Sequence, residues 1–163
     1  MKILVLILII LFSVYVGYLC SKSYVKRRKF LNELCGFLMF LKSEIKFKNN
    51  KIINIFENYY NESSCIFLKT FLKNYIDTFN LENKSNELFK GVDFLKNEEK
   101  EKITNFINFL GKKDLLTQVE EIDIFQQDLL VMVKKIEEDC KKYCPLYLKL
   151  GFVFGLFICL III

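Results

Sequence analysis

The chain has 163 residues, 53% of them hydrophobic, and its 24 Lys and Arg against 19 Asp and Glu give a net charge of +5. This length predicts one domain plus membrane segments, and so small a positive charge argues against a nucleic-acid binder. The chain has no histidine, no glycine-rich phosphate loop and no Cys-x-x-Cys pair, so we predict no enzymatic activity, no cofactor and no metal site.

An apolar run from Ile3 to Tyr18 opens the chain, and no acidic or basic side chain lies between Lys2 and Lys22. About 20 such residues are enough to cross a bilayer as a helix, so we predict a transmembrane anchor over residues 1–24. More Lys and Arg follow this run than precede it, which places the N-terminus outside and the rest of the chain in the cytoplasm. A cleaved signal peptide is the alternative, but it would need the opposite charge balance and a cleavage site of the Ala-x-Ala kind.

A basic cluster, which consists of Lys26, Arg27, Arg28 and Lys29, follows this anchor. The lipid bilayer is its predicted partner, because each basic side chain near anionic head groups adds about 1 kcal/mol of attraction. The alternative is that the cluster only sets the topology of the anchor and contacts no particular lipid.

The pattern after the anchor is typical of a long helix between Tyr24 and Lys48. Apolar residues recur there at alternating steps of three and four, at Leu31, Leu34, Leu38, Leu41 and Ile45. Phe30, Phe37 and Phe40 widen this apolar face, so several neighbours are expected to pack on it. We therefore predict an all-α protein whose residues 25–145 form a cytoplasmic helical bundle, with two long helices that continue into the membrane.

Shorter helices are expected between the two long ones. After a turn at Asn49 and Asn50, residues 52–60 predict a second helix. Ser63 or Ser64 is expected to cap the third. Its buried face would consist of Cys65, Leu68, Leu72, Tyr75, Ile76 and Phe79. The polar residues 82–87 predict a loop.

Residues typical of the beginnings and ends of helices are also present in the second half of the predicted bundle. Asn97 is the predicted N-cap of a helix that begins with several glutamates, and Gly111 is predicted to end that helix in the left-handed conformation. Asp114 would then cap the longest soluble helix. Its predicted seam is Leu115, Val119, Ile122, Leu129, Val133, Ile136, Cys140 and Tyr143. Gln126 interrupts this seam, where it either sets the register or is tolerated at a half-exposed edge.

The long helix is expected to close or kink at Pro145, before a second apolar segment over residues 146–163. This segment is long enough to span a bilayer only if Lys149 lies within it and extends its ammonium group to the head groups. We expect a membrane crossing, and insertion into one leaflet is the alternative. Gly151 and Gly155 form a Gly-x-x-x-Gly motif, which allows close approach of helices.

Three motifs occur in a characteristic order. They are Glu44-Ile45-x-Phe47, Phe106-x-x-x-Leu110-Gly111-x-x-Asp114-x-x-x-Gln118 and Lys149-Leu150-Gly151-x-x-x-Gly155. With these motifs, and with Gly17, Tyr24 and Arg28 near the anchor, the chain resembles the stage III sporulation protein AB family over essentially its whole length. The resemblance implies a component of the channel complex between mother cell and forespore. It also implies a soluble domain similar to the cytoplasmic domains of the platform proteins of type II secretion and type IV pilus systems.

The family resemblance implies that the chain is a platform without enzymatic activity. It would dock a secretion-type hexameric ATPase, the stage III sporulation protein AA, to the other channel membrane proteins, with the soluble domain on the mother-cell side of the outer forespore membrane. Gly111, Asp114 and Gln118 are the predicted contact residues, because their turn faces away from the membrane if both long helices run into it. In the alternative, Gly111 and Asp114 only end and begin helices, and Gln118 bonds locally.

Two other functions compete with the platform. One is a membrane-remodelling or pore-forming oligomer built from the two apolar ends, although a simple pore former needs no large bundle between them. The other is a lipid-binding tether that acts through the basic cluster.

Overall fold

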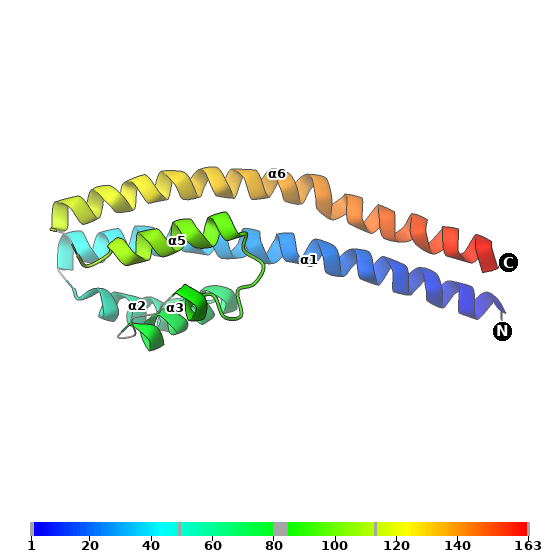
Figure 1. Ribbon diagram of the computed structural model, residues 1–163, viewed down its shortest axis with the longest axis horizontal. Helices are drawn as coiled ribbons and strands as arrows, with labels where there is room; N and C mark the ends of the chain where they lie inside the picture. The colour runs from blue at the N-terminus through cyan, green and yellow to red at the C-terminus, as the bar shows by residue number, and fades with distance from the viewer. Residues whose placement is uncertain (1, 49, 80–84, 113, 163) are drawn as a thin grey trace. The chain divides into compact units, whose positions relative to one another are not determined.

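The computed structural model describes residues 2–48, 50–79, 85–112 and 114–162, which are mostly helical and contain no strand (Figure 1). In chain order the elements are α1 (Lys2–Ser43), the π-helical segment η1 (Glu44–Lys48), α2 (Ile52–Glu62), α3 (Ile66–Thr78), α4 (Ser85–Leu88), α5 (Asn97–Phe109) and α6 (Leu115–Ile162). The predicted all-α class with two long terminal helices is confirmed. The chain forms two compact units, to which α1 and α6 both contribute.

The first unit, here called the hairpin, consists of residues 1–28 and 134–163. Its two helical segments run antiparallel. The Cys144 thiol donates a hydrogen bond to the carbonyl oxygen of Ser21 at 3.7 Å, whereas the Cys159 thiol donates one to the carbonyl oxygen of Leu6 at 3.5 Å. Both helices contain a segment long and apolar enough to cross a membrane.

Small residues bring the two backbones of the hairpin into contact. The Ser13 hydroxyl donates a hydrogen bond of 2.6 Å to the carbonyl oxygen of Gly151. A Cβ atom on Gly151 would lie 2.8 Å from the carbonyl oxygen of Ser13, and one on Gly17 would overlap the carbonyl oxygen of Tyr147. At Gly155 an added Cβ would lie 3.1 Å from the Cα of Ile10. The Gly-x-x-x-Gly motif therefore packs directly against α1.

Helix α6 continues through Pro145, so of the two predicted outcomes closure of the helix at this residue is wrong, and a kink stays a prediction. A proline removes one N–H from the helix, which leaves the carbonyl group of Lys141 without its usual partner. Lys141 and Pro145 are both exposed, so this carbonyl group can be solvated outside the helix.

The second unit, here called the bundle, consists of residues 29–133. The predicted seam is confirmed, since its four leucines in α1 and Ile45 in η1 are all buried. Phe30 and Phe37 are also fully buried, and Phe40 is half-buried. The ring centroid of Phe37 lies 4.8 Å from that of Phe56 in α2, and the centroid of Phe56 lies 4.0 Å from that of Tyr75 in α3. Aromatic rings thus connect the first three helices.

Within α2 and α3, tertiary packing differs from the predicted faces. Ile55 and Phe71 are fully buried although the sequence pattern did not single them out, while Ile76 is half-buried and Phe79 is 36% exposed. The predicted serine cap of α3 is wrong, because Cys65 occupies the N-cap. Ser63 is instead the C-cap of α2 and donates its backbone N–H to the carbonyl oxygen of Tyr59 at 2.8 Å.

The described part of the predicted loop at residues 82–87 is helical, since residues 85–87 belong to α4, and residues 82–84 lie outside the described residues. Helix α5 begins one residue earlier than predicted, with Lys96 as its N-cap. The buried carboxylate of Glu99 reaches back and accepts a hydrogen bond of 3.0 Å from the Lys96 backbone N–H. On α6, Ile122, Leu129 and Val133 are buried as predicted, and Gln126 is half-buried. The first predicted seam residue, Leu115, is instead 49% exposed, because it lies at the end of the helix.

Candidate docking site

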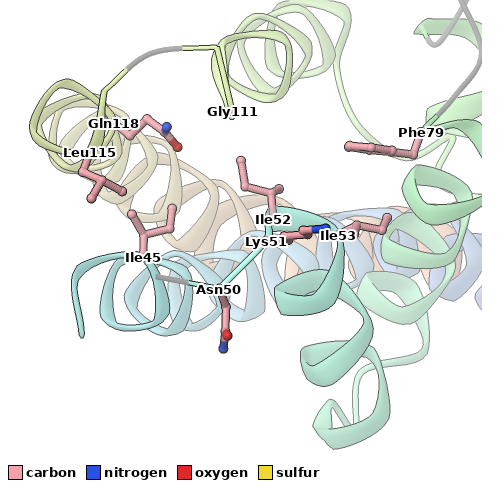
Figure 2. Close-up of a pocket in the computed structure, with 9 residues that line it drawn as sticks. All are labelled: Ile45, Asn50, Lys51, Ile52, Ile53, Phe79, Gly111, Leu115 and Gln118. Atoms are coloured by element: carbon pink, nitrogen blue, oxygen red, sulfur yellow. The ribbon is translucent and has the colours of Figure 1, made fainter. Parts of the chain in front are cut away.

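A pocket of about 420 Å³ lies in the bundle where the turn after α1 meets the turn between α5 and α6 (Figure 2). Its lining is mainly apolar and consists of Ile45, Asn50, Lys51, Ile52, Ile53, Phe79, Gly111, Leu115 and Gln118. Figure 2 shows the side chains of Ile45, Ile52 and Leu115 gathered around one space. The pocket can therefore receive an apolar group while polar side chains remain at its edge.

Two of the sequence motifs meet in this pocket. Ile45 comes from Glu44-Ile45-x-Phe47, whereas Gly111 and Gln118 come from the motif that ends at Gln118. The two segments are far apart in the sequence. Their meeting was not predicted, because no local pattern indicates which turns of a bundle lie together.

The first motif forms the turn after α1. The carboxylate of Glu44 is buried and accepts a hydrogen bond of 2.7 Å from the side-chain amide of Asn50. This contact spans the turn that precedes α2. Ile45 is only 3% exposed, whereas Phe47 is 75% exposed. Packing within the bundle thus accounts for Glu44 and Ile45, but it does not account for the large exposed ring of Phe47.

The glycine of the second motif has the role in the fold that was predicted for it. Gly111 follows α5 with a φ of +79°, in the left-handed region where residues with a Cβ atom are strained. A Cβ atom at this position would also lie 2.9 Å from the Cδ1 atom of Ile52. The left-handed backbone at the end of α5 therefore favours glycine at position 111, whereas the contact with Ile52 would only require the end of that side chain to shift.

Asp114 caps α6 as predicted. Its carboxylate accepts a hydrogen bond of 3.2 Å from the backbone N–H of Thr117 and another of 2.7 Å from the Thr117 hydroxyl. Gln118 is 7% exposed and lines the pocket together with Gly111, while Asp114 is exposed and does not line it. The structure thus brings two of the three predicted contact residues into one pocket. Their contact with a partner stays a prediction.

Positive side chains outnumber negative ones near the pocket. Lys51 lines it, and Lys46 and Lys112, which are both exposed, directly follow the lining residues Ile45 and Gly111 in the sequence. Asp114 is the exposed carboxylate in the same segments, whereas Glu44 is buried. This arrangement favours a partner surface that combines an apolar side chain with acidic groups.

The members of the basic cluster differ in exposure. Arg27 is 7% exposed and Lys26 is half-buried, whereas Arg28 and Lys29 are exposed. Within the helix α1 these four residues point in different directions, so they do not form a single flat cationic surface. The predicted contact with lipid head groups stays a prediction, and the exposure favours Arg28 and Lys29 for it.

Burial raises the pKa of two groups in the bundle and of Cys140 in the hairpin. It raises the pKa of Tyr75 to about 12 and also raises the pKa of the Cys35 thiol. The pKa of Cys140 is raised first by burial and then by the neighbouring Cys144 thiol, although Arg28 opposes the shift. These three groups therefore remain protonated at neutral pH, as packed core groups do, rather than acting as nucleophiles.

The family model of stage III sporulation protein AB matches residues 2–163. The chain belongs to the stage III sporulation protein AB family. Neither the comparison with curated proteins nor the comparison with solved structures gave a match. The family consists of sporulation structural proteins and is not a known enzyme family. Its members act in stage III of sporulation, and the two long apolar helices of this chain are compatible with membrane association.

Proposed function

We propose that this chain is a non-enzymatic membrane platform of the channel between mother cell and forespore, and that the pocket of its bundle docks the secretion-type hexameric ATPase, stage III sporulation protein AA. One observation carries the proposal: two separate motifs of the chain line one mainly apolar pocket. The other stage III channel membrane proteins would then assemble with the hairpin.

Exposed apolar side chains near the pocket support docking. Leu115 lines the pocket and is 49% exposed, and the next residue, Leu116, is 78% exposed. Phe47, in the turn that supplies Ile45, adds an exposed aromatic ring. Large apolar groups beside a pocket are the usual anchors of protein interfaces, and they would otherwise remain in contact with water.

The hairpin supports an anchor that crosses the membrane twice. Contacts continue from Ser21 and Cys144 at one end to Leu6 and Cys159 at the other, so the second apolar segment packs along the same length as the first. Insertion of the second segment into one leaflet would separate these pairs. The remaining surface of both segments is largely apolar, as lipid contact requires. The excess of basic residues on the bundle side of the anchor supports a bundle in the mother-cell cytoplasm.

A binding experiment tests the docking site. The full chain in detergent micelles is immobilised and titrated with the purified ATPase, with Leu115→Ser compared with Leu130→Ser. Both leucines lie on α6 and are similarly exposed, at 49% and 44%, but only Leu115 lines the pocket. We expect Leu115→Ser to weaken binding at least about fivefold, as the loss of an interface anchor does, and Leu130→Ser to leave it unchanged. Equal binding by both variants and the unmodified chain would exclude this pocket as the docking site, and no binding by the unmodified chain would contradict the platform.

The pore-forming alternative receives less support from the hairpin. Its two segments touch backbone to backbone at Gly17 and Gly151, so no water-filled path runs between them. A pore would need polar faces that line up between several copies, and Lys149 is the one charged residue between Cys144 and Ile162. Conductance of liposomes that contain the purified chain alone would favour the pore.

A further inference from the structure

A second hollow of the bundle, of about 360 Å³, lies between α5 and α6 and is here called the α5–α6 groove. It has no lining residue in common with the candidate docking pocket. Its apolar surface consists of Phe106, Phe109, Ile124 and Phe125. The rings of Phe106 and Phe125 are both 7% exposed and stack with their centroids 4.2 Å apart, so they join the two helices. Packing of the bundle thus accounts for these rings, whereas Ile124 remains 58% exposed.

Ile124 does not stand alone on its face of α6. Val131 follows it seven positions later and is 67% exposed. Seven residues make about two helical turns, so the two side chains lie on the same face of the helix. Helices that dock in a groove are held by apolar anchors at such spacings. This face of α6, together with the groove beside it, therefore suits an apolar helix face of a partner.

The charges around the groove are mainly negative. Glu121 and Asp128 line it, and the adjacent Glu120 is exposed. Asp128 pairs with Lys102 at 3.3 Å, but within the part of the chain that the structure describes neither Glu120 nor Glu121 forms an ion pair. Residues 97–109 and 115–133 together contain seven carboxylates and two lysines, although the whole chain has a net charge of +5. Complementary charge on a partner would therefore be positive.

We propose that the α5–α6 groove binds a basic amphipathic helix of another protein. The apolar face of that helix would cover Ile124 and Val131, and its lysine or arginine side chains would pair with Glu120 and Glu121. A second copy of this chain fits less well, because a two-fold contact along this face would place the acidic side chains of both copies opposite one another. Basic side chains predominate around the candidate docking pocket, so the two surfaces select partner surfaces of opposite charge. The groove therefore does not depend on the docking proposed for the ATPase.

Binding of a synthetic helix tests the apolar part of the groove. The probe is a fluorescent peptide of leucine, alanine and lysine whose leucines recur at steps of three and four, and a scrambled peptide of the same composition is its control. The full chain in uncharged detergent micelles is titrated against it, and the fluorescence anisotropy in empty micelles is subtracted. We expect Ile124→Ser to weaken binding at least about fivefold. Ile66→Ser should leave binding unchanged, since Ile66 is a 75% exposed isoleucine of α3 that does not line the groove.

Charge reversal tests the acidic edge in the same assay. Glu121→Lys should weaken binding of the probe at least about tenfold, because like charges would then face each other across the contact. Glu137→Lys is the matched control and should leave binding unchanged. Both glutamates are half-buried residues of α6, but only Glu121 lines the groove. Thermal melting in the same micelles identifies a variant that fails to fold, and Glu120→Lys, at an exposed position, then replaces Glu121→Lys.

Four results would overturn the proposal. Failure of the unmodified chain to bind the probe, or equal binding of the probe and the scrambled peptide, would show that the groove does not recognise an amphipathic helix. Equal binding by Ile124→Ser and the unmodified chain would place the contact elsewhere. Equal losses in Glu121→Lys and Glu137→Lys would show attraction by net charge alone. Dimerisation of the full chain that Ile124→Ser abolishes would assign this face to a second copy.

Discussion

In the hairpin α1 and α6 meet through Ser13, Gly17 and Gly151, where backbone touches backbone, whereas in the bundle α1 and α2 meet through rings such as those of Phe37 and Phe56. The lipid environment proposed for the hairpin, as against water around the bundle, would explain the difference. In water, burying a large ring is strongly favourable, because each aromatic side chain buries about 150–250 Å² of surface that would otherwise contact water. Lipid tails are as apolar as a phenylalanine, so large side chains gain little there. Close packing of small residues and interhelical hydrogen bonds then hold the helices together.

The largest effect is expected from removing a central ring of the bundle. Phe37→Ala should lower the free energy of unfolding by about 3–5 kcal/mol, because Phe37 is fully buried and a cavity would remain. Phe47→Ala is the control, since this ring is 75% exposed, and its effect should stay within about 0.5 kcal/mol. Denaturant unfolding followed by near-ultraviolet circular dichroism measures both. Similar losses from the two variants would contradict the assignment of Phe37 to the core.

In the hairpin, enlarging a small residue at the helix contact should destabilise the protein, whereas shortening an exposed side chain should not. Gly151→Leu should destabilise the hairpin by about 1–3 kcal/mol, because even a Cβ atom would lie 2.8 Å from the carbonyl oxygen of Ser13. Phe154→Leu is the control on the same helix, where the side chain is 63% exposed, and should have little effect. Unfolding in mixed micelles with increasing SDS measures the difference. A Gly151→Leu protein as stable as the unmodified chain would show that the helices do not approach as described.

Glycine has a different role in the bundle, and Gly111 tests it. Gly111→Ala should cost about 1–2 kcal/mol, because its φ of +79° strains a residue with a Cβ atom. Gly111→Asn should cost less, since asparagine tolerates the left-handed conformation better than alanine. Thermal melting of the full chain in micelles would rank the two variants. The reverse order would show that the contact with Ile52, rather than backbone conformation, dominates at this position.

The smallest effect is expected from Ser13→Ala in the hairpin. The change removes the 2.6 Å hydrogen bond to the carbonyl oxygen of Gly151 but keeps a small side chain. Interhelical hydrogen bonds in membranes contribute about 0.6 kcal/mol on average, so the loss should be near that value. The SDS unfolding assay measures it. A loss as large as that of Gly151→Leu would mean that hydrogen bonding, rather than close approach, holds the hairpin together.

The sequence predicted those features that depend on local chemistry. The leucine seam of α1, the left-handed Gly111 and the cap at Asp114 were all confirmed. Helical periodicity and helix termini depend on residues that are close together in the sequence, so a local pattern is enough to predict them. The membrane topology, the domain boundaries at residues 24 and 146, and the partner contacts stay predictions.

Features that depend on distant contacts were not predictable in the same way. Ile55 and Phe71 are fully buried because other helices cover them, and a single helix pattern does not contain that information. The N-cap of α5 is Lys96 rather than the predicted Asn97, because the Glu99 carboxylate folds back and accepts a hydrogen bond from the Lys96 backbone N–H. The pocket combines two turns that are far apart in the sequence. Its position follows from how the helices pack, so neither motif could indicate it alone.

The hydrogen bond between Ser13 and Gly151 joins residues that are 138 positions apart, and this separation has a consequence for biosynthesis. At a translation rate of about 5–20 residues per second, roughly 7–28 s separate the synthesis of Ser13 from that of Gly151. During that interval the glycine and serine face of α1 has no second helix of the hairpin to pack against. The whole bundle is synthesised in the meantime. A closed hairpin can therefore form only on a chain whose bundle has already been translated.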